Sequence, residues 1–144
     1  MASAQELTLR FMDGFNSRDR SAIRALLAQR LEYIRPGGGL LTTPEEVMAQ
    51  YERDWELASE ARVEVREMLE SGHSIMAEIT VHATIGGRSE SSEGALAHRW
   101  HDGKLVRYRL YADPFLADFA AVPGHVVASG VPVDDDPSVD SGKR

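Results

Sequence analysis

Three side chains in the second half of the chain could move or hold a proton: Glu78, His98 and Tyr108. An imidazole exchanges protons near neutral pH, and a phenol can donate a hydrogen bond to an oxygen that gains negative charge. A buried carboxyl group has a raised pKa, which suits a general base. Together these residue types could catalyse proton transfer on a carbonyl compound, so we expect no cofactor.

Two of these candidates also have a purely structural interpretation. His98 could be a core histidine that is satisfied by one hydrogen bond, and Tyr108 could fill the core with its hydroxyl at the rim. The choice depends on which way the strands turn these side chains.

The strands that carry His98 and Tyr108 meet at His101-Asp102-Gly103-Lys104, which is a strong hairpin signal. A two-residue turn at Asp102-Gly103 would mix arginines with apolar residues on one face. A three-residue loop, with Gly103 in the left-handed bulge position, shifts the pairing by one residue and separates the faces. We predict this loop, because it leaves the arginines in water. The inward face then consists of Leu96, His98, Trp100, Val106, Tyr108 and Leu110.

Helical patterns fill the first part of the chain. Leu7, Phe11 and Phe15 recur at helical spacing, and a second short helix carries Ile23, Leu26 and Leu27. The sequence Thr43-Pro44-Glu45-Glu46 predicts the start of a third helix, with Thr43 as the cap and Pro44 in the first position. Its apolar stripe consists of Val47, Tyr51, Trp55 and Ala58.

Strand patterns follow the helices. We expect a short strand over 31–35 and long strands over 62–70, 74–85, 92–101 and 104–113. Helices that precede a mostly antiparallel sheet in the sequence indicate an α+β fold, in which the helices lie on one face of the sheet. Residues 1–121 are expected to form one domain. Residues 122–144 have few large apolar side chains and are predicted to be a flexible acidic tail.

The composition excludes several classes of function. The chain has 144 residues, a formal net charge of -7 and no cysteine. Nucleic acids and anionic membranes reward a basic surface, so neither is an expected partner. The histidines lack metal-ligand spacing, so we expect no metal site. The beginning of the sequence lacks a signal-peptide pattern, and no apolar run approaches the ~20 residues that span a bilayer, so we expect a cytoplasmic protein.

Several short segments resemble one protein family. They are Phe11-Met12-Asp13, Asp19 and the run from Asp102 to Pro114 that contains Tyr111-Ala112-Asp113. This pattern resembles the SnoaL-like branch of the nuclear-transport-factor-2-like (NTF2-like) superfamily, over residues 7–119. Polyketide cyclases, ketosteroid isomerases and limonene-epoxide hydrolase belong to that superfamily. The resemblance implies a cone-like α+β barrel, in which three N-terminal helices pack on a strongly curved, mostly antiparallel sheet around a conical pocket.

The resemblance also implies roles for single residues. Tyr33 falls at the position of a water-positioning tyrosine of the epoxide hydrolase, Arg35 at that of an asparagine, and Phe15 at that of an apolar wall residue. The Asp-Arg-Asp catalytic set of that enzyme maps to Thr80, Glu78 and Leu110. None of the three is kept, so epoxide hydrolysis is disfavoured.

The apolar pattern of the strand and the family resemblance disagree about which face of the sheet carries Glu78. The apolar residues of its strand alternate so that Glu78, Thr80 and His82 should point outward. The family register turns them into the pocket, because a partner subunit covers the outer face of the sheet in the family. We follow the family register, which makes Glu78 a candidate general base with Arg35 as its counter-ion.

These observations lead to one expected function and one alternative. We expect a pocket for a small apolar or polycyclic molecule and a cofactor-independent isomerase or cyclase, in which Glu78 or His98 moves the proton and Tyr108 or Tyr33 holds oxygen. The alternative is a non-catalytic ligand-binding or dimerisation module. In both cases we expect a homodimer through the outer sheet face. The expected ligand-binding residues are Phe15, Tyr33, Arg35, Tyr51, Trp55, Thr80, Leu96, Trp100 and Leu110.

Overall fold

The computed structural model describes residues 2–36 and 39–112. The predicted tail over 122–144 and the predicted domain boundary at residue 121 lie outside the described residues. In the described part, no helix is long and apolar enough to cross a membrane.

Three helices form as predicted, and each has a capped N-terminus. Helix α1 (Ala4–Ser17) starts with a capping box between Ser3 and Glu6, and α2 (Arg20–Leu26) is capped by Asp19. Helix α3 (Pro44–Leu57) begins with Thr43 accepting from the amide of Glu46. The carboxylate of Glu46 accepts from the amide of Thr42 at 2.7 Å. Each cap satisfies amides that the first turn leaves without partners.

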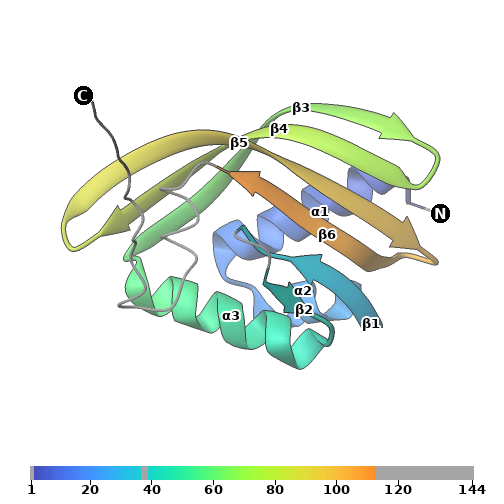
Figure 1. Ribbon diagram of the computed structural model, residues 1–144, viewed down its shortest axis with the longest axis horizontal. Helices are drawn as coiled ribbons and strands as arrows, with labels where there is room; N and C mark the ends of the chain where they lie inside the picture. Colours follow the sequence, from blue (N-terminus) through green and yellow to red (C-terminus); the bar gives the residue numbers. More distant parts are fainter. Residues whose placement is uncertain (1, 37–38, 113–144) are drawn as a thin grey trace, which may run out of the picture.

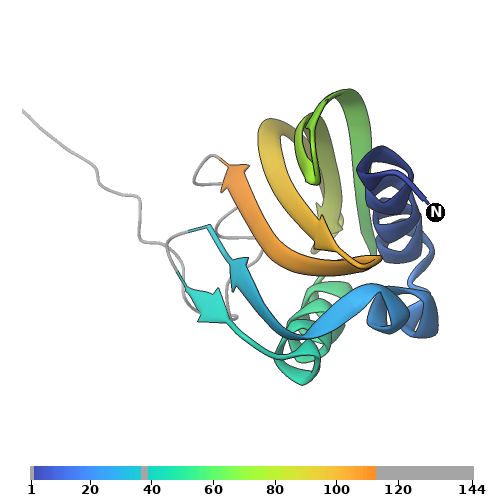
Figure 2. The same ribbon diagram turned by 90° about the vertical axis from the view of Figure 1, so that its right-hand side faces the viewer.

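The strands form one six-stranded sheet in the order β2-β1-β6-β5-β4-β3. They are β1 (Leu27–Ile34), β2 (Leu40–Leu41), β3 (Glu60–Ser71), β4 (Ser74–Ile85), β5 (Arg88–His101) and β6 (Lys104–Ala112). Neighbours are antiparallel except for the parallel pair β1 and β6. The long strands curve, and the helices lie on the concave side of the sheet (Figures 1 and 2). This is the expected α+β cone.

The hairpin between β5 and β6 turns His98 and Tyr108 to the same face, as predicted, but its pairing and its turn differ from the prediction. His98 lies directly opposite Tyr108, and His101 pairs with Lys104, which leaves a two-residue turn. Asp102 and Gly103 both have positive φ, at 51° and 76°, as a type I′ turn requires. A bulge next to Trp100 then shifts the pairing by one residue. The prediction of a three-residue loop was therefore wrong, because a bulge inside the strand supplies the shift instead.

The bulge also changes which residues of β6 face the interior. Leu105 is completely buried and lies opposite Trp100. Val106 is only partly buried, although it was predicted to face inward. Tyr108 keeps its predicted place because it lies beyond the extra residue.

Strand β4 settles the conflict over Glu78 in favour of the apolar pattern. Ile75, Ala77 and Ile79 are each at most 2% exposed, whereas Glu78 between them is exposed. Thr80 shares the outer face with Glu78 and lies between Glu64 and Glu93 in the register. The prediction that Glu78 and Thr80 enter the pocket was wrong, because alternate residues of a strand point to opposite faces and the apolar set is the buried one.

Candidate functional site

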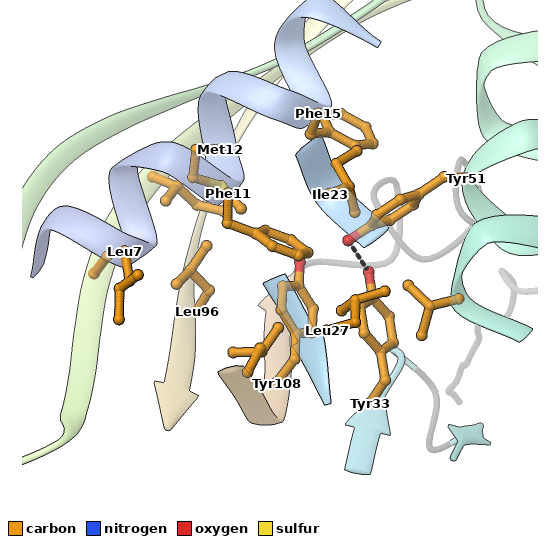
Figure 3. Close-up of a cluster of buried hydrophobic side chains, with 14 of the residues drawn as sticks. Leu7, Phe11, Met12, Phe15, Ile23, Leu27, Tyr33, Tyr51, Leu96 and Tyr108 are labelled. Atoms are coloured by element: carbon orange, nitrogen blue, oxygen red, sulfur yellow. Dashed lines mark hydrogen bonds between the residues drawn. The ribbon is translucent and has the colours of Figure 1, made fainter. Parts of the chain in front are cut away.

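A small cavity of about 60 Å³ lies between the concave sheet face and α3. Its walls come from α1, β1, α3 and the ends of β3, β4 and β6, and most of its lining is apolar. The residues that line it are Met12, Phe15, Tyr33, Arg35, Pro36, Gln50, Tyr51, Asp54, Val63, Val81, Tyr108 and Leu110. Figure 3 shows Phe15, Tyr33, Tyr51 and Tyr108 as part of one cluster of buried side chains. The cavity is therefore an opening in the hydrophobic core that several polar groups reach.

The polar groups of the cavity include three tyrosines. The hydroxyl of Tyr33 donates to the hydroxyl of Tyr51 at 2.8 Å, shown as a dashed line in Figure 3. The rings of Tyr33 and Tyr108 stack with centroids 4.1 Å apart and an angle of 1°. This stack follows from the register, because Tyr33 and Tyr108 are direct neighbours on parallel strands.

The tyrosines are neutral donors. Burial raises the pKa of Tyr33 and of Tyr51 well above 10, and it raises the pKa of Tyr108 to about 12. The charge of Asp54 adds to the increase for all three phenols. At neutral pH these hydroxyls therefore keep their protons, and those of Tyr51 and Tyr108 can donate hydrogen bonds to an oxygen in the cavity.

Asp54 is the acidic group of the cavity. The residue is 6% exposed, and burial raises the pKa of its carboxyl group to about 7. Gln50, one turn earlier on α3, donates its Nε2 to the carboxylate at 2.9 Å, which opposes the increase. The carboxyl group thus populates both protonation states near neutral pH, which is the condition for efficient general acid–base catalysis.

Two arginines partly offset the effect of burial on the pKa of Asp54. The positive charges of Arg35 and Arg53 both lower the pKa of Asp54. Arg35 follows the end of β1 and lines the cavity. Arg53 lies on the exposed side of α3 and donates to the side-chain oxygen of Gln50 at 2.8 Å. Gln50 is therefore held between Arg53 and Asp54, and its amide is oriented toward the carboxylate.

His98 lies in a different part of the interior. It is 2% exposed, and its Nδ1 is 3.1 Å from the hydroxyl of Thr8, which accepts from Trp100 Nε1 at 3.0 Å. The indole N–H can only donate, so the hydroxyl of Thr8 is the acceptor in its bond with Trp100. Burial lowers the pKa of His98 to about 3, so the ring is neutral at pH 7.

The predicted site residues therefore separate into three groups. Those that line the cavity are Phe15, Tyr33, Arg35, Tyr51, Tyr108 and Leu110. Those that are buried in the core without lining the cavity are Trp55, Leu96, His98 and Trp100. Glu78 and Thr80 lie on the outer face of the sheet. Among the described residues, no three acidic or histidine side chains converge as metal ligands would.

The sequence analysis missed Asp54 and Gln50, although a signal for both was present. They fall three residues after Val47 and Tyr51, so they belong to the same helical stripe that is buried in the structure. A carboxylate on an apolar stripe must be desolvated, and such a position is a candidate for function. The predicted site included Tyr51 and Trp55 from this stripe but not its two polar members.

The arrangement defines a class of protein: a curved sheet whose concave face is closed by helices around a small, mostly apolar cavity. Solved structures share this fold. An NTF2-like protein of unknown function from Burkholderia pseudomallei is 24% identical, with 78% of this chain and 92% of that chain covered and a TM-score of 0.72. A proposed polyketide cyclase from Pseudomonas putida is 21% identical over 78% and 93%, with a TM-score of 0.68. An epoxide hydrolase from Mycobacterium tuberculosis that is like limonene-epoxide hydrolase is 17% identical over 81% and 87%, with a TM-score of 0.71.

The sequence itself identifies the family. The model of the SnoaL-like domain matches residues 8–108, and the chain belongs to this family. No relative is found among proteins with curated descriptions. The predicted resemblance to the SnoaL-like branch of the NTF2-like superfamily is thus confirmed.

Proposed function

We propose that the cavity binds the oxygen-bearing end of a small, mostly apolar molecule and that Asp54 moves a proton on it. The observation that carries the proposal is a buried carboxyl group with a pKa of about 7 that shares one cavity with three neutral phenols. The carboxylate would remove a proton next to a carbonyl group, and the phenols would stabilise the enolate oxygen. This is the chemistry of a cofactor-independent isomerase or cyclase.

The structure changes the residues to which this function is assigned. Glu78 lies on the outer face and His98 does not line the cavity, so the proposal gives neither a catalytic role. Asp54 takes the place of both as the base. Tyr51 and Tyr108 act as the donors to oxygen.

The size of the cavity limits the ligand. A volume of about 60 Å³ is far below the roughly 300–1,000 Å³ of pockets that enclose drug-sized ligands. We therefore propose a group no larger than one ring inside the cavity, in place of a polycyclic molecule. Fold relatives that include a proposed polyketide cyclase support an enolisable carbonyl compound as the ligand class.

Hydrogen–deuterium exchange tests the proposal without knowledge of the full reaction. Single-ring ketones are incubated with the protein in D₂O, and loss of the α-proton signal is followed by NMR. We expect exchange above the buffer rate, and we expect Asp54→Asn to reduce the enzymatic rate by a factor of about 100 to 10,000. Glu78→Gln is the matched control, because it removes an acidic group from the outer face, and it should leave the rate unchanged.

The pH dependence of the same exchange gives a second check. The base must be ionised to accept a proton, so the rate should rise as pH increases and level off above the pKa of about 7. Exchange that persists in Asp54→Asn with the same pH profile would contradict the role of Asp54. Ketones that bind without any exchange would instead support the alternative, a non-catalytic ligand-binding module.

We also propose a homodimer through the outer sheet face. In the register this face carries Glu67 and Glu78 in one row and Arg99 and Arg107 toward the other end of the strands, with the half-exposed Met76 between them. A two-fold axis through the middle would place the acidic row of one copy over the basic row of the other. Native mass spectrometry and light scattering should report a dimer that Met76→Lys weakens. A monomer at high protein concentration would contradict this part of the proposal.

A further inference from the structure

We propose that Tyr33 is a positioning residue. Its hydroxyl donates a hydrogen bond to the hydroxyl of Tyr51, and the hydroxyl of Tyr51 in turn donates a hydrogen bond to an acceptor oxygen of the ligand. The inference rests on the proposed function, because it assumes that a ligand oxygen enters the cavity. It goes further by assigning different roles to two neighbouring phenols and by restricting the group that they recognise.

The ring of Tyr33 has little freedom to move. It is 6% exposed, and one face stacks on Tyr108 with centroids 4.1 Å apart. The ring of Tyr51 meets it at 75° with centroids 5.9 Å apart. Both neighbours are fixed by secondary structure, since Tyr108 is paired with Tyr33 in the sheet and Tyr51 lies on α3. The hydroxyl of Tyr33 is therefore held at one place, beside that of Tyr51.

The direction of the hydrogen bond between the two hydroxyls decides which proton is available. Tyr33 donates and Tyr51 accepts, over 2.8 Å. A phenol has one proton, so the proton of Tyr33 is used by this bond. Among the described residues, the hydroxyl of Tyr51 makes no further hydrogen bond, and its proton needs another acceptor.

The position of Tyr51 indicates where that acceptor must be. Tyr51 is 3% exposed and lines the cavity, so bulk water does not surround its hydroxyl. A buried donor without an acceptor is costly. A ligand oxygen, or water before the ligand binds, is the group that can satisfy it.

The chemical class of the ligand follows from this assignment. The proton of Tyr51 can be donated only to an acceptor, such as a carbonyl or enolate oxygen. An ammonium group or an amide N–H offers a donor at the same place and leaves the proton of Tyr51 without a partner. The cavity should therefore prefer a ketone over an amine of the same shape.

A double-mutant cycle tests whether Tyr33 acts through Tyr51. The probe is cyclohex-2-enone labelled with ¹³C at the carbonyl, whose resonance moves downfield when it accepts a hydrogen bond and also reports binding. We expect Tyr51→Phe to weaken binding by about tenfold and to remove most of the shift, and Tyr33→Phe to weaken binding by about threefold with a smaller loss of shift. The double variant should equal Tyr51→Phe, because the Tyr33 hydroxyl has no separate effect. Independent, multiplicative effects would overturn the proposal, as would a Tyr33→Phe variant that binds and shifts the probe like the unmodified protein.

A ligand-free measurement separates this proposal from the proposed function. In protein with ¹³Cζ-labelled tyrosine, the deuterium isotope shift reports how fast each hydroxyl proton exchanges with solvent. The Tyr33 proton, held by Tyr51, should exchange more slowly than the Tyr51 proton, and Tyr51→Phe should accelerate its exchange. The matched control is Tyr111→Phe, which removes a half-exposed hydroxyl. Absence of ketone binding would contradict the proposed function; slower exchange at Tyr51 than at Tyr33 would overturn the positioning role.

Discussion

Two regions of the interior hold titratable groups among aromatic rings, and they differ in what those groups can still do. Around His98, Thr8 connects the imidazole to Trp100 within a packed core. Around Asp54, the phenols and the carboxylate adjoin a cavity. Burial shifts the pKa of both titratable groups, to about 3 for His98 and to about 7 for Asp54. A shifted pKa therefore marks burial, and only the adjoining cavity distinguishes the candidate site from the core.

Removal of one hydroxyl in each region should give the sharpest contrast. Thr8→Val keeps the shape of the side chain but leaves Trp100 Nε1 and His98 Nδ1 without their partner, so we expect a loss of about 3 kcal/mol in the free energy of unfolding. Tyr51→Phe should lose less than about 1 kcal/mol, because water in the cavity can replace its hydroxyl. Urea denaturation at pH 7.5 measures both. Equal losses would show that the two regions are equally packed.

The charge of Asp54 should reduce stability at alkaline pH. Burial raises the folded-state pKa to about 7, so the folded chain retains a proton that the unfolded chain releases above about pH 4. The stability that this proton provides is complete below about pH 4 and is lost as pH rises through 7. Asp54→Asn should be more stable than the unmodified protein by about 2 kcal/mol at pH 8 and similar to it at pH 4.5.

The pH comparison of Asp54→Asn isolates one group. The depressed pKa of His98 makes stability rise with pH between about 3 and 6.5, but it does so equally in both proteins and cancels in the difference. Urea denaturation at the two pH values is the measurement. If Asp54→Asn were less stable than the unmodified protein at pH 8, this would show that Arg35 and Gln50 compensate for the desolvation of the Asp54 carboxylate.

The hairpin of β5 and β6 carries His98 from the first region and Tyr108 from the second, and its turn should tolerate little change. Gly103 has a φ of 76°, and no atom would meet an added Cβ, so Gly103→Ala changes only the backbone strain. We expect a loss of about 1 kcal/mol by thermal denaturation. A neutral result would indicate that the turn can relax without the positive φ.

The smallest effect is expected outside both regions. Glu78 lies on the exposed face of β4, so Glu78→Gln should change the free energy of unfolding by less than about 0.5 kcal/mol. Chemical denaturation of the purified variant measures this. A large loss would restore a buried role for Glu78 and remove the distinction between the two faces of the strand.

Sequence reasoning found the fold and about half of the site. Tyr33, Tyr51 and Tyr108 were predicted from strand parity, helix periodicity and the resemblance, and all three line the cavity. Glu78 was misplaced because the family register was preferred over the apolar alternation of its own strand. Asp54 was missed because a helical stripe was interpreted only through its apolar members. In both cases the apolar periodicity of the strand or helix indicated the correct position of the residue.

The sequence by itself determined the elements, since caps at Ser3, Asp19 and Thr43 and the alternation along β4 are local properties of the chain. Only the tertiary structure decided that Asp54 lines the cavity together with the tyrosines, whereas His98 packs against the ring of Tyr108 without lining the cavity. That difference depends on how α3 packs against β1 and on the bulge beside Trp100, and both set distances between residues that are far apart in the sequence. Local patterns fix which face of an element is buried, but they do not fix which buried faces leave a space between them.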